Sequence, residues 1–456
     1  MTAPATVGIP VARPKRRGAE LRLLAVAMLL AAGARAAVQI GVDEKVTYSV
    51  VTYVLALAAL FTIAHLAVRR WAPYADPLLL PLVAALLAVG TAMIYRLDLA
   101  TSDGAPADAP LQLLWTAIGV ALFVLLLAFL PDHRVLARYS YTFGLAGLIL
   151  LLLPSLLPAR YSEVNGAKVW ILLFGFSFQP SEIAKLLLMV FFASYLVAKR
   201  PVLSVVTRNI GPLQLPRARD LGPVLVAWLA SMLVLVRESD LGSALLFFGI
   251  FIVMLYVATE RASWLFIGLA LFAGGAAVAY TSFGHVQERV DIWLHAFSGQ
   301  NPTNHSYQLV QGLFGFATGG ILGTGLGRGE PQTVPFARTD FIFAAIGEEL
   351  GLVGVMGVLI VYFILVARGL RAGIGVRDSF GKLLAGGLAA SLAIQTFVVV
   401  GGVMRVIPLT GLTLPFVSYG GSSVIANFVL VAMLIRISDA GRRPATWPPE
   451  QPGASR

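Results

Sequence analysis

The sequence predicts an all-α protein that crosses a membrane many times. Hydrophobic residues make up 58% of the 456 positions and charged residues only 12%, whereas soluble domains carry about 25% charged residues. Apolar stretches of bilayer-spanning length recur along the chain, and basic residues concentrate on alternate connections between them. Apart from closed β-barrels, only helices satisfy their backbone hydrogen bonds inside a bilayer.

Twelve apolar stretches are long enough to cross about 30 Å of hydrocarbon. They are 21–40, 48–67, 78–95, 112–130, 139–158, 181–198, 221–236, 241–258, 262–282, 341–368, 380–403 and 421–437. The seventh stretch is short, and only Arg237–Asp240 separates it from the eighth. We therefore expect these two to form either a tight hairpin or a partly re-entrant segment.

The basic residues predict which ends of the spans face the cytoplasm. With both termini inside, 23 of the 34 Lys and Arg residues fall in the tails, the even-numbered connections and the adjoining span ends, against 9 in outer connections and 2 within spans. Such an excess is the positive-inside pattern. The net charge of +11 is therefore an orientation signal, and we expect no nucleic-acid partner. Arg35, near the end of the first span, is expected to extend towards the interface.

One outer connection, Phe283–Thr339, is far longer than the others. Long connections in compact proteins are usually functional. Within it, Ser306–Ile321 has apolar residues at helical spacing beside two glutamines, which predicts an amphipathic helix in the outer interface. This segment is either part of a functional site or a structural cap over the bundle.

The segment Pro408–Ser423, P-L-T-G-L-T-L-P-F-V-S-Y-G-G-S-S, leads into the last span. Its prolines, glycines and hydroxyl side chains do not suit a helix that faces lipid. Irregular backbone at membrane depth persists only where protein covers it or where it lines a watery cavity. The alternative is an ordinary loop near one membrane face.

Ionisable residues at membrane depth are costly and are functional candidates. Glu182 and Lys185 open the sixth span at a spacing of three, so both side chains share one helix face. They form either a self-neutralising structural pair or the floor of a polar cavity near the outer leaflet that binds a phosphate or a sugar. Of the adjacent acids Glu348 and Glu349, at least one must face protein or water. Trp170, before the sixth span, suits a binding site or an interfacial anchor.

Five motifs occur in order along the chain. They are N-G-A-K-V-W (165–170), Q-P-S-E-I-A-K (179–185), E-S-D-L-G-S-A-L (238–245), T-D-F-I-F-A-A-I-G-E-E-L-G (339–351) and the whole of Pro408–Ser423. Together they resemble the shape, elongation, division and sporulation family of RodA, FtsW and SpoVE.

The resemblance implies a division of the chain. The family's ten-helix core would be 78–437, with the large extracytoplasmic connection 283–339 inside it. Residues 21–77 would be two additional N-terminal helices, as in RodA-like proteins of high-GC Gram-positive bacteria. Residues 1–20 would be a basic cytoplasmic tail and 438–456 a disordered cytoplasmic tail.

The resemblance also implies a function. Family members are peptidoglycan glycosyltransferases of the cytoplasmic membrane that polymerise lipid II at its outer face during cell elongation or division, beside a class B penicillin-binding protein that cross-links the strands. This reaction needs a general base, and cationic groups or a divalent cation such as Mg or Mn for the leaving pyrophosphate. The substrate-binding residues that the motifs imply are Trp170, Glu182, Lys185, Tyr307, Gln308, Asp340, Ser418, Tyr419 and Ser422.

The chain departs from the family at the proposed base, an Asp within a D-P-x-x-x-x-Y-Q pattern. Here Asn301 stands at that position, with the spacing to Tyr307 and Gln308 kept. An amide cannot accept a proton as a carboxylate does. Either another group serves as the base, or the chain is a non-catalytic relative, or it carries a substitution. The substitute bases are Asp291, ten residues earlier, and then His295 and His305; none of them matches the family position.

Three functions remain open on the sequence alone: a lipid II polymerase, a scaffold that binds lipid II or a penicillin-binding protein, and a flippase for lipid-linked precursors. The residue at position 301 separates the first two. Against transport, the two halves of the chain lack the paired interrupted helices that mark transporter sites.

Overall fold

The computed structural model describes residues 17–100, 107–164, 167–173, 176–203, 208–210, 213–215, 226, 228–229, 232–233, 240–298 and 306–444. Ten of the described helices are long and apolar enough to cross a bilayer. They are α1 (Arg17–Asp43), α2 (Tyr48–Trp71), α3 (Leu79–Leu99), α4 (Asp108–Phe129), α8 (Pro180–Leu203), α10 (Leu241–Thr259), α11 (Ser263–Ser282), α14 (Ile342–Gly375), α15 (Ser379–Val403) and α16 (Gly421–Arg442). A shorter apolar helix, α6 (Ser140–Leu156), runs beside α8.

The predicted fold class, an all-α polytopic membrane protein, is confirmed. Each expected span except 221–236 coincides with one of these helices, and 221–236 lies largely outside the described residues. The remaining elements are short. They are α5 (Val135–Arg138), α7 (Ala159–Ser162), the antiparallel pair β1 (Ile171–Leu173) and β2 (Phe176–Phe178), the antiparallel pair β3 (Arg208–Ile210) and β4 (Leu213–Leu215), α12 (Gly284–Leu294), α13 (Tyr307–Gly319) and η2 (Pro331–Thr333).

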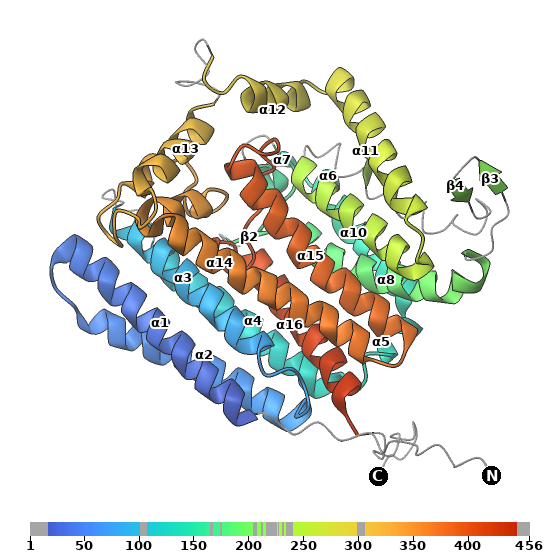
Figure 1. Cartoon of the computed structure of the whole chain (residues 1–456), viewed down its shortest axis with the longest axis horizontal. Helices are drawn as coiled ribbons and strands as arrows, with labels where there is room; N and C mark the ends of the chain where they lie inside the picture. The colour runs from blue at the N-terminus through green and yellow to red at the C-terminus, as the bar shows by residue number, and fades with distance from the viewer. Residues whose placement is uncertain are drawn as a thin grey trace, which may run out of the picture.

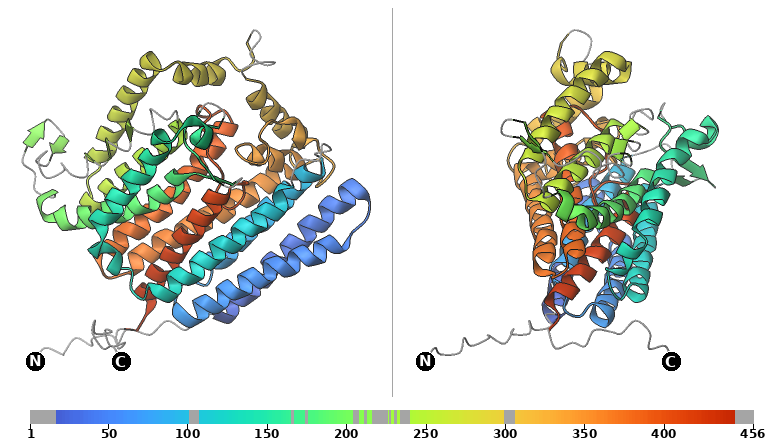
Figure 2. Two further views of the ribbon diagram at one scale, coloured as in Figure 1. Left: turned by 180° about the vertical axis from the view of Figure 1, so that it is seen from behind. Right: turned by 90° about the vertical axis from the view of Figure 1, so that its right-hand side faces the viewer.

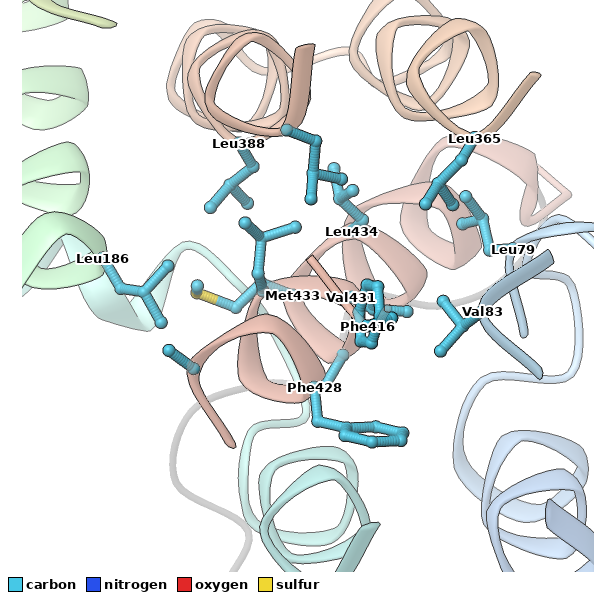
Figure 3. Close-up of a cluster of buried hydrophobic side chains, with 14 of the residues drawn as sticks. Leu79, Val83, Leu186, Leu365, Leu388, Phe416, Phe428, Val431, Met433 and Leu434 are labelled. Carbon is cyan, nitrogen blue, oxygen red and sulfur yellow. The ribbon is translucent and has the colours of Figure 1, made fainter. Parts of the chain in front are cut away.

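Helix α16 lies at the centre of the bundle, and 89% of its most apolar window is buried. Its Phe428 ring lies between the rings of Phe61, Phe123 and Phe416, with centroid distances of 6.4, 6.5 and 5.7 Å. Figure 3 shows Met433 and Leu434 of α16 among side chains of surrounding helices, such as Leu186 of α8 and Leu388 of α15. The last span of the sequence is thus enclosed by other helices, chiefly α4, α14, α8 and α15.

Helices α1 and α2 pack along one side of the bundle, α1 against α3 and α2 against α4 (Figure 1). The expectation that Arg35 extends to the interface is wrong. Its side chain is only 8% exposed, and its guanidinium carbon lies 3.5 Å from the ring centroid of Tyr95 and 4.4 Å from that of Tyr53. Two aromatic faces attract the cation at this depth, so Arg35 joins α1 to α2 and α3.

Glu348 and Glu349 on α14 both face protein. Glu349 accepts from Arg96 Nε at 2.8 Å and from the Gly327 N–H at 3.0 Å, and Glu348 accepts from the Glu330 N–H at 2.6 Å. The two acids therefore hold the turn that follows α13. Gly351, with φ of 62°, interrupts the helix just beyond them and lets this turn approach α14.

The described residues of the outer connection form the α-helices α12 and α13 and the short 3₁₀-helix η2. Its predicted amphipathic helix is α13, whereas α12 was not anticipated. Both lie beyond one end of the core helices, while α1 begins and α16 ends at the opposite end (Figures 1 and 2). A small apolar cluster that includes Ala296, Leu309 and Phe341 packs this connection against the core.

Candidate functional site

Lys185 and Glu182 lie one turn apart on α8 and form a buried ion pair. Lys185 Nζ is 2.6 Å from Glu182 Oε2 and donates to Gln395 Oε1 at 2.9 Å, and both charged side chains are at most 5% exposed. The expected contact between them is present. Gln395 Nε2 in turn donates to the Thr413 carbonyl at 2.9 Å, which connects the pair to the irregular segment 408–423.

Protein covers most of the irregular segment and bonds part of its backbone. The buried Ser418 hydroxyl donates to the Thr339 carbonyl at 2.6 Å and accepts from the Leu414 N–H at 2.8 Å. Gln112 on α4 donates to the Ser418 carbonyl at 3.1 Å. Ser418 therefore supports the segment and the start of α14.

Ser422 and Tyr419 each form a hydrogen bond with the backbone of another segment. The Ser422 hydroxyl, 5% exposed, accepts from the Gln179 N–H at 2.8 Å. The Tyr419 N–H donates to the Arg338 carbonyl at 2.8 Å. Burial, together with the charge of Asp108, raises the pKa of the Tyr419 phenol to about 12, so this side chain stays protonated at neutral pH.

A cavity of about 370 Å³ opens at the end of the bundle where α12 and α13 lie. Its lining combines one face of α12 with the entry to α14 and the start of the irregular segment. The lining residues are Ala167, His285, Glu288, Arg289, Ile292, Gln308, Asp340, Phe341, Leu409 and Gly411. The predicted residues Gln308 and Asp340 are thus brought together here.

Arg289 is the cation of this cavity and is not among the residues expected from the sequence. Its Nη1 donates to the Leu409 carbonyl at 2.8 Å, which fixes the guanidinium against the irregular segment. Its charge acts on two carboxyl groups, those of Asp340 and Asp240. Its place in the long outer connection, upstream of Tyr307 and Gln308, is the signal that could have identified it.

The two carboxyl groups are held on either side of the irregular segment. Asp240 caps α10, accepting from the Ser243 N–H at 2.9 Å, and Gly242 beside it packs directly on the Thr410 carbonyl. Asp340 lies beside Gly411. Burial raises the pKa of Asp240, and the charge of Glu182 adds to this effect. Asp240 therefore interacts electrostatically both with Glu182 of the ion pair and with Arg289 of the cavity.

Asp340 has an unusual pKa for an aspartate. Enclosure by protein raises the pKa of its carboxyl to about 6, although a hydrogen bond from Thr339 and the charge of Arg289 act in the opposite direction. The carboxyl is outside the membrane-spanning part of α14. It can therefore exchange a proton near neutral pH.

The other predicted residues lie away from the cavity lining. Trp170 precedes β1, and its N–H donates to the Ser162 carbonyl at 3.3 Å. Tyr307 begins α13 and is 39% exposed. Asp291 pairs with His295 at 2.9 Å, and both side chains are more than half exposed. Asn301, and His305 with it, falls outside the described residues.

The residues that the structure describes bring no three acidic or histidine side chains together as a metal-binding cluster. The candidate site is therefore a polar cavity with one fixed cation, one enclosed carboxyl group and a buried ion pair connected to it through Asp240.

Comparison with known proteins agrees with this architecture. The sequence model of the cell cycle proteins FtsW, RodA and SpoVE matches residues 77–443. The peptidoglycan glycosyltransferase RodA of Mycobacterium tuberculosis is 54% identical over 447 residues, which are 97% of this chain and 94% of the relative.

Solved structures show the same fold. One, described as structural coordination of polymerization and crosslinking by a peptidoglycan synthase complex, aligns with a TM-score of 0.64 and 29% identity over 80% of this chain and 97% of the other. The rod shape determining protein RodA of Thermus thermophilus aligns with a TM-score of 0.58 and 27% identity, over 80% of this chain and 96% of the other. The chain therefore belongs to the FtsW, RodA and SpoVE family of cell cycle proteins and is a multi-pass protein of the cytoplasmic membrane.

Proposed function

We propose that this chain is a peptidoglycan glycosyltransferase that joins lipid II molecules into glycan strands at the outer face of the cytoplasmic membrane. The observation that carries the proposal is the cavity in which Arg289 and Asp340 meet at one end of a membrane bundle. Relatives that match nearly the whole chain at 51–54% identity are named peptidoglycan glycosyltransferases, which supports the same activity here.

The position of the cavity suits a lipid-linked substrate. It lies at the end of the bundle opposite to the start of α1 and the end of α16, and the distribution of basic residues predicts that those two ends face the cytoplasm. A lipid-linked disaccharide can then place its polar head in the cavity while its tail stays in the hydrocarbon.

The charged groups suit the chemistry of glycosyl transfer. The new bond joins a sugar 4-oxygen to an anomeric carbon, and the lipid pyrophosphate leaves with negative charge. A fixed arginine stabilises such charge best in a site that excludes water, and Arg289 is held in place by the Leu409 carbonyl. The Glu182–Lys185 pair does not line the cavity. We propose that it supports the irregular segment beneath the substrate head through Gln395.

A divalent cation is a further expectation for the leaving pyrophosphate. Asp340 and Glu288 line the cavity, but the described residues alone do not supply three oxygen or nitrogen side-chain ligands from His, Asp or Glu. The described side chains thus fit such an ion poorly, and the proposed reaction does not depend on one.

We propose a cross-linking partner of the class B penicillin-binding type. One solved relative belongs to a complex that coordinates polymerization and crosslinking, and this chain covers 97% of that relative's length. A single-pass transpeptidase beside the bundle would receive the glycan strand as it forms.

The test is polymerisation of purified lipid II by the purified protein, alone and with its partner, with the Asn301→Asp variant beside it. Glycan strands from the parent protein or from the variant support the proposal. Bound lipid II with no strand from either protein contradicts it. That outcome would favour the second candidate, a scaffold that holds lipid II, which the amide at position 301 specifically suggests.

A further inference from the structure

Asn301 leaves the proposed reaction without its usual proton acceptor, because a neutral amide cannot take up the hydroxyl proton. We propose that Asp340 accepts the proton of the attacking sugar 4-hydroxyl in this chain. This assignment rests on the function proposed above and identifies the general base of the same site.

The cavity lining restricts the choice among the described residues. Three side chains that line it can accept a proton: His285, Glu288 and Asp340. Asp291 and His295, the substitutes that the sequence suggested, pair with each other on the exposed side of α12. They do not line the cavity.

Asp340 is the best fixed of the three. It follows Thr339, whose carbonyl accepts from the buried Ser418 hydroxyl, and it precedes Phe341, which is 1% exposed. Glu288, in contrast, is exposed on α12. A general base must be held within hydrogen-bond reach of the proton that it removes, and these contacts fix the backbone on both sides of Asp340.

The neighbours of Asp340 also suit the role. Arg289 approaches from α12, so the carboxyl and the cation for the leaving group share one cavity. A base beside the attacking hydroxyl and a cation beside the leaving pyrophosphate are the two groups that the displacement requires. Burial and the charge of Arg289 lower the pKa of the third candidate, His285, which makes it a weaker base than a free imidazole.

The pKa of Asp340 depends on its burial and on the charged groups around it. Arg289, Glu288 and His285 face the cavity from α12, and Asp240 lies at the start of α10 across the irregular segment. Enclosure outweighs Arg289 and brings the pKa of Asp340 to about 6. The carboxyl is therefore largely ionised at pH 7, with a basicity close to the working pH, where general-base catalysis is most efficient.

The proposed step transfers one proton and one glycosyl group. The Asp340 carboxylate takes the 4-hydroxyl proton, the freed oxygen pair forms the bond to the anomeric carbon, and the bond from that carbon to the pyrophosphate oxygen breaks with its electron pair. The proton on Asp340 then passes to water or to the departing pyrophosphate. No oxidant or reductant is needed.

The experiment compares five full-length proteins in detergent or vesicles: the parent, Asp340→Asn, Asn301→Asp, the double variant and Asp43→Asn. Asp43 is exposed at the outer end of α1, so its variant controls for loss of an acid elsewhere. Lipid II polymerisation is measured together with binding of fluorescent lipid II and with melting temperature.

We expect Asp340→Asn to lower polymerisation by about 10²–10⁴-fold with lipid II binding and melting unchanged, and Asp43→Asn to have no effect. Adding Asn301→Asp to Asp340→Asn should restore activity, because a carboxylate then returns to the family position. The parent rate should also fall as the pH drops below about 6, the pKa of Asp340.

Three outcomes would overturn the assignment. Asp340→Asn could keep the parent rate, His285→Gln or Asp291→Asn could abolish polymerisation in its place, or the parent could be inactive while Asn301→Asp is active. Failure of the parent and of Asn301→Asp together would instead refute the proposed polymerase activity, and the assignment with it.

Discussion

Trp293 on α12 and Arg405 after α15 are joined in both directions. The Trp293 indole N–H donates to the Arg405 carbonyl at 3.1 Å, and Arg405 Nε donates to the Trp293 carbonyl at 2.7 Å. Arg405 also donates to the Leu294 carbonyl at 2.8 Å. These bonds fix the end of α12 to the bundle. The part of the outer connection that leads to Asn301 begins there.

Removing this attachment should affect catalysis more than stability. Arg405→Ala should lower lipid II polymerisation by about 10- to 100-fold, because small displacements of reacting groups have effects of this size. Lipid II binding should change much less. Trp293→Phe keeps an aromatic side chain but removes the indole N–H, and with it one of the three hydrogen bonds. Its rate should therefore lie between those of Arg405→Ala and the parent. Equal rates for all three proteins would show that α12 needs no such anchor.

The Glu182–Lys185 pair should matter for stability. Removing one partner leaves a buried charge unpaired, which typically costs about 3–5 kcal/mol, so Glu182→Ala or Lys185→Ala should lower the melting temperature, the activity or both. The double Ala variant should lose less than the sum of the two single variants. Parent-like melting and lipid II binding in all three variants would contradict a role for the pair.

Restoring a carboxylate at position 301 should increase polymerisation. In the Asp340→Asn variant no base remains, and general-base catalysis contributes about 10²–10⁴-fold, so adding Asn301→Asp should raise the rate by at least about tenfold over this low baseline. Asn301→Ala is the matched control, and it should leave the baseline unchanged because it supplies no proton acceptor. If Asn301→Asp left the low rate of Asp340→Asn unchanged, a carboxylate at position 301 could not act as the base in this chain.

The predicted orientation can be tested directly because the chain contains no Cys. Thr303→Cys should react with a membrane-impermeant thiol reagent added to intact cells, whereas Arg371→Cys should react only after the cells are opened. Labelling in the opposite order would invert the topology and place the cavity on the cytoplasmic side.

Gly90 should tolerate no side chain. A Cβ at this position would lie 2.4 Å from the Val417 carbonyl oxygen, where α3 meets the irregular segment. Overpacking of this kind typically costs about 1–3 kcal/mol, so Gly90→Ala should lower the melting temperature. Gly33→Ala is a matched control in α1, because nothing lies within 4 Å of its added Cβ. Similar melting of both variants would contradict this close approach.

Most of the helices are predictable from the sequence because a bilayer imposes a simple rule. A span needs about 20 apolar residues, and this signal is local, so composition alone locates α1 to α4, α14, α15 and α16. The i, i+3 spacing likewise predicted that Glu182 and Lys185 would share a face. Helix α12 gave no such signal, because its eleven residues are too few to span a bilayer. Its position depends on contacts with Arg405 and Leu409.

The membrane class, the helix content, the family motifs and the amide at position 301 follow from the sequence alone, because each of these is a property of composition or of short spacing. Which charges meet depends on the tertiary structure. Arg289, Asp340 and Asp240 lie on separate elements, and Arg35 lies between two tyrosines instead of at the interface. Charges far apart in the chain interact only after apolar helices such as α16 have packed, since packing removes the water that would otherwise screen them.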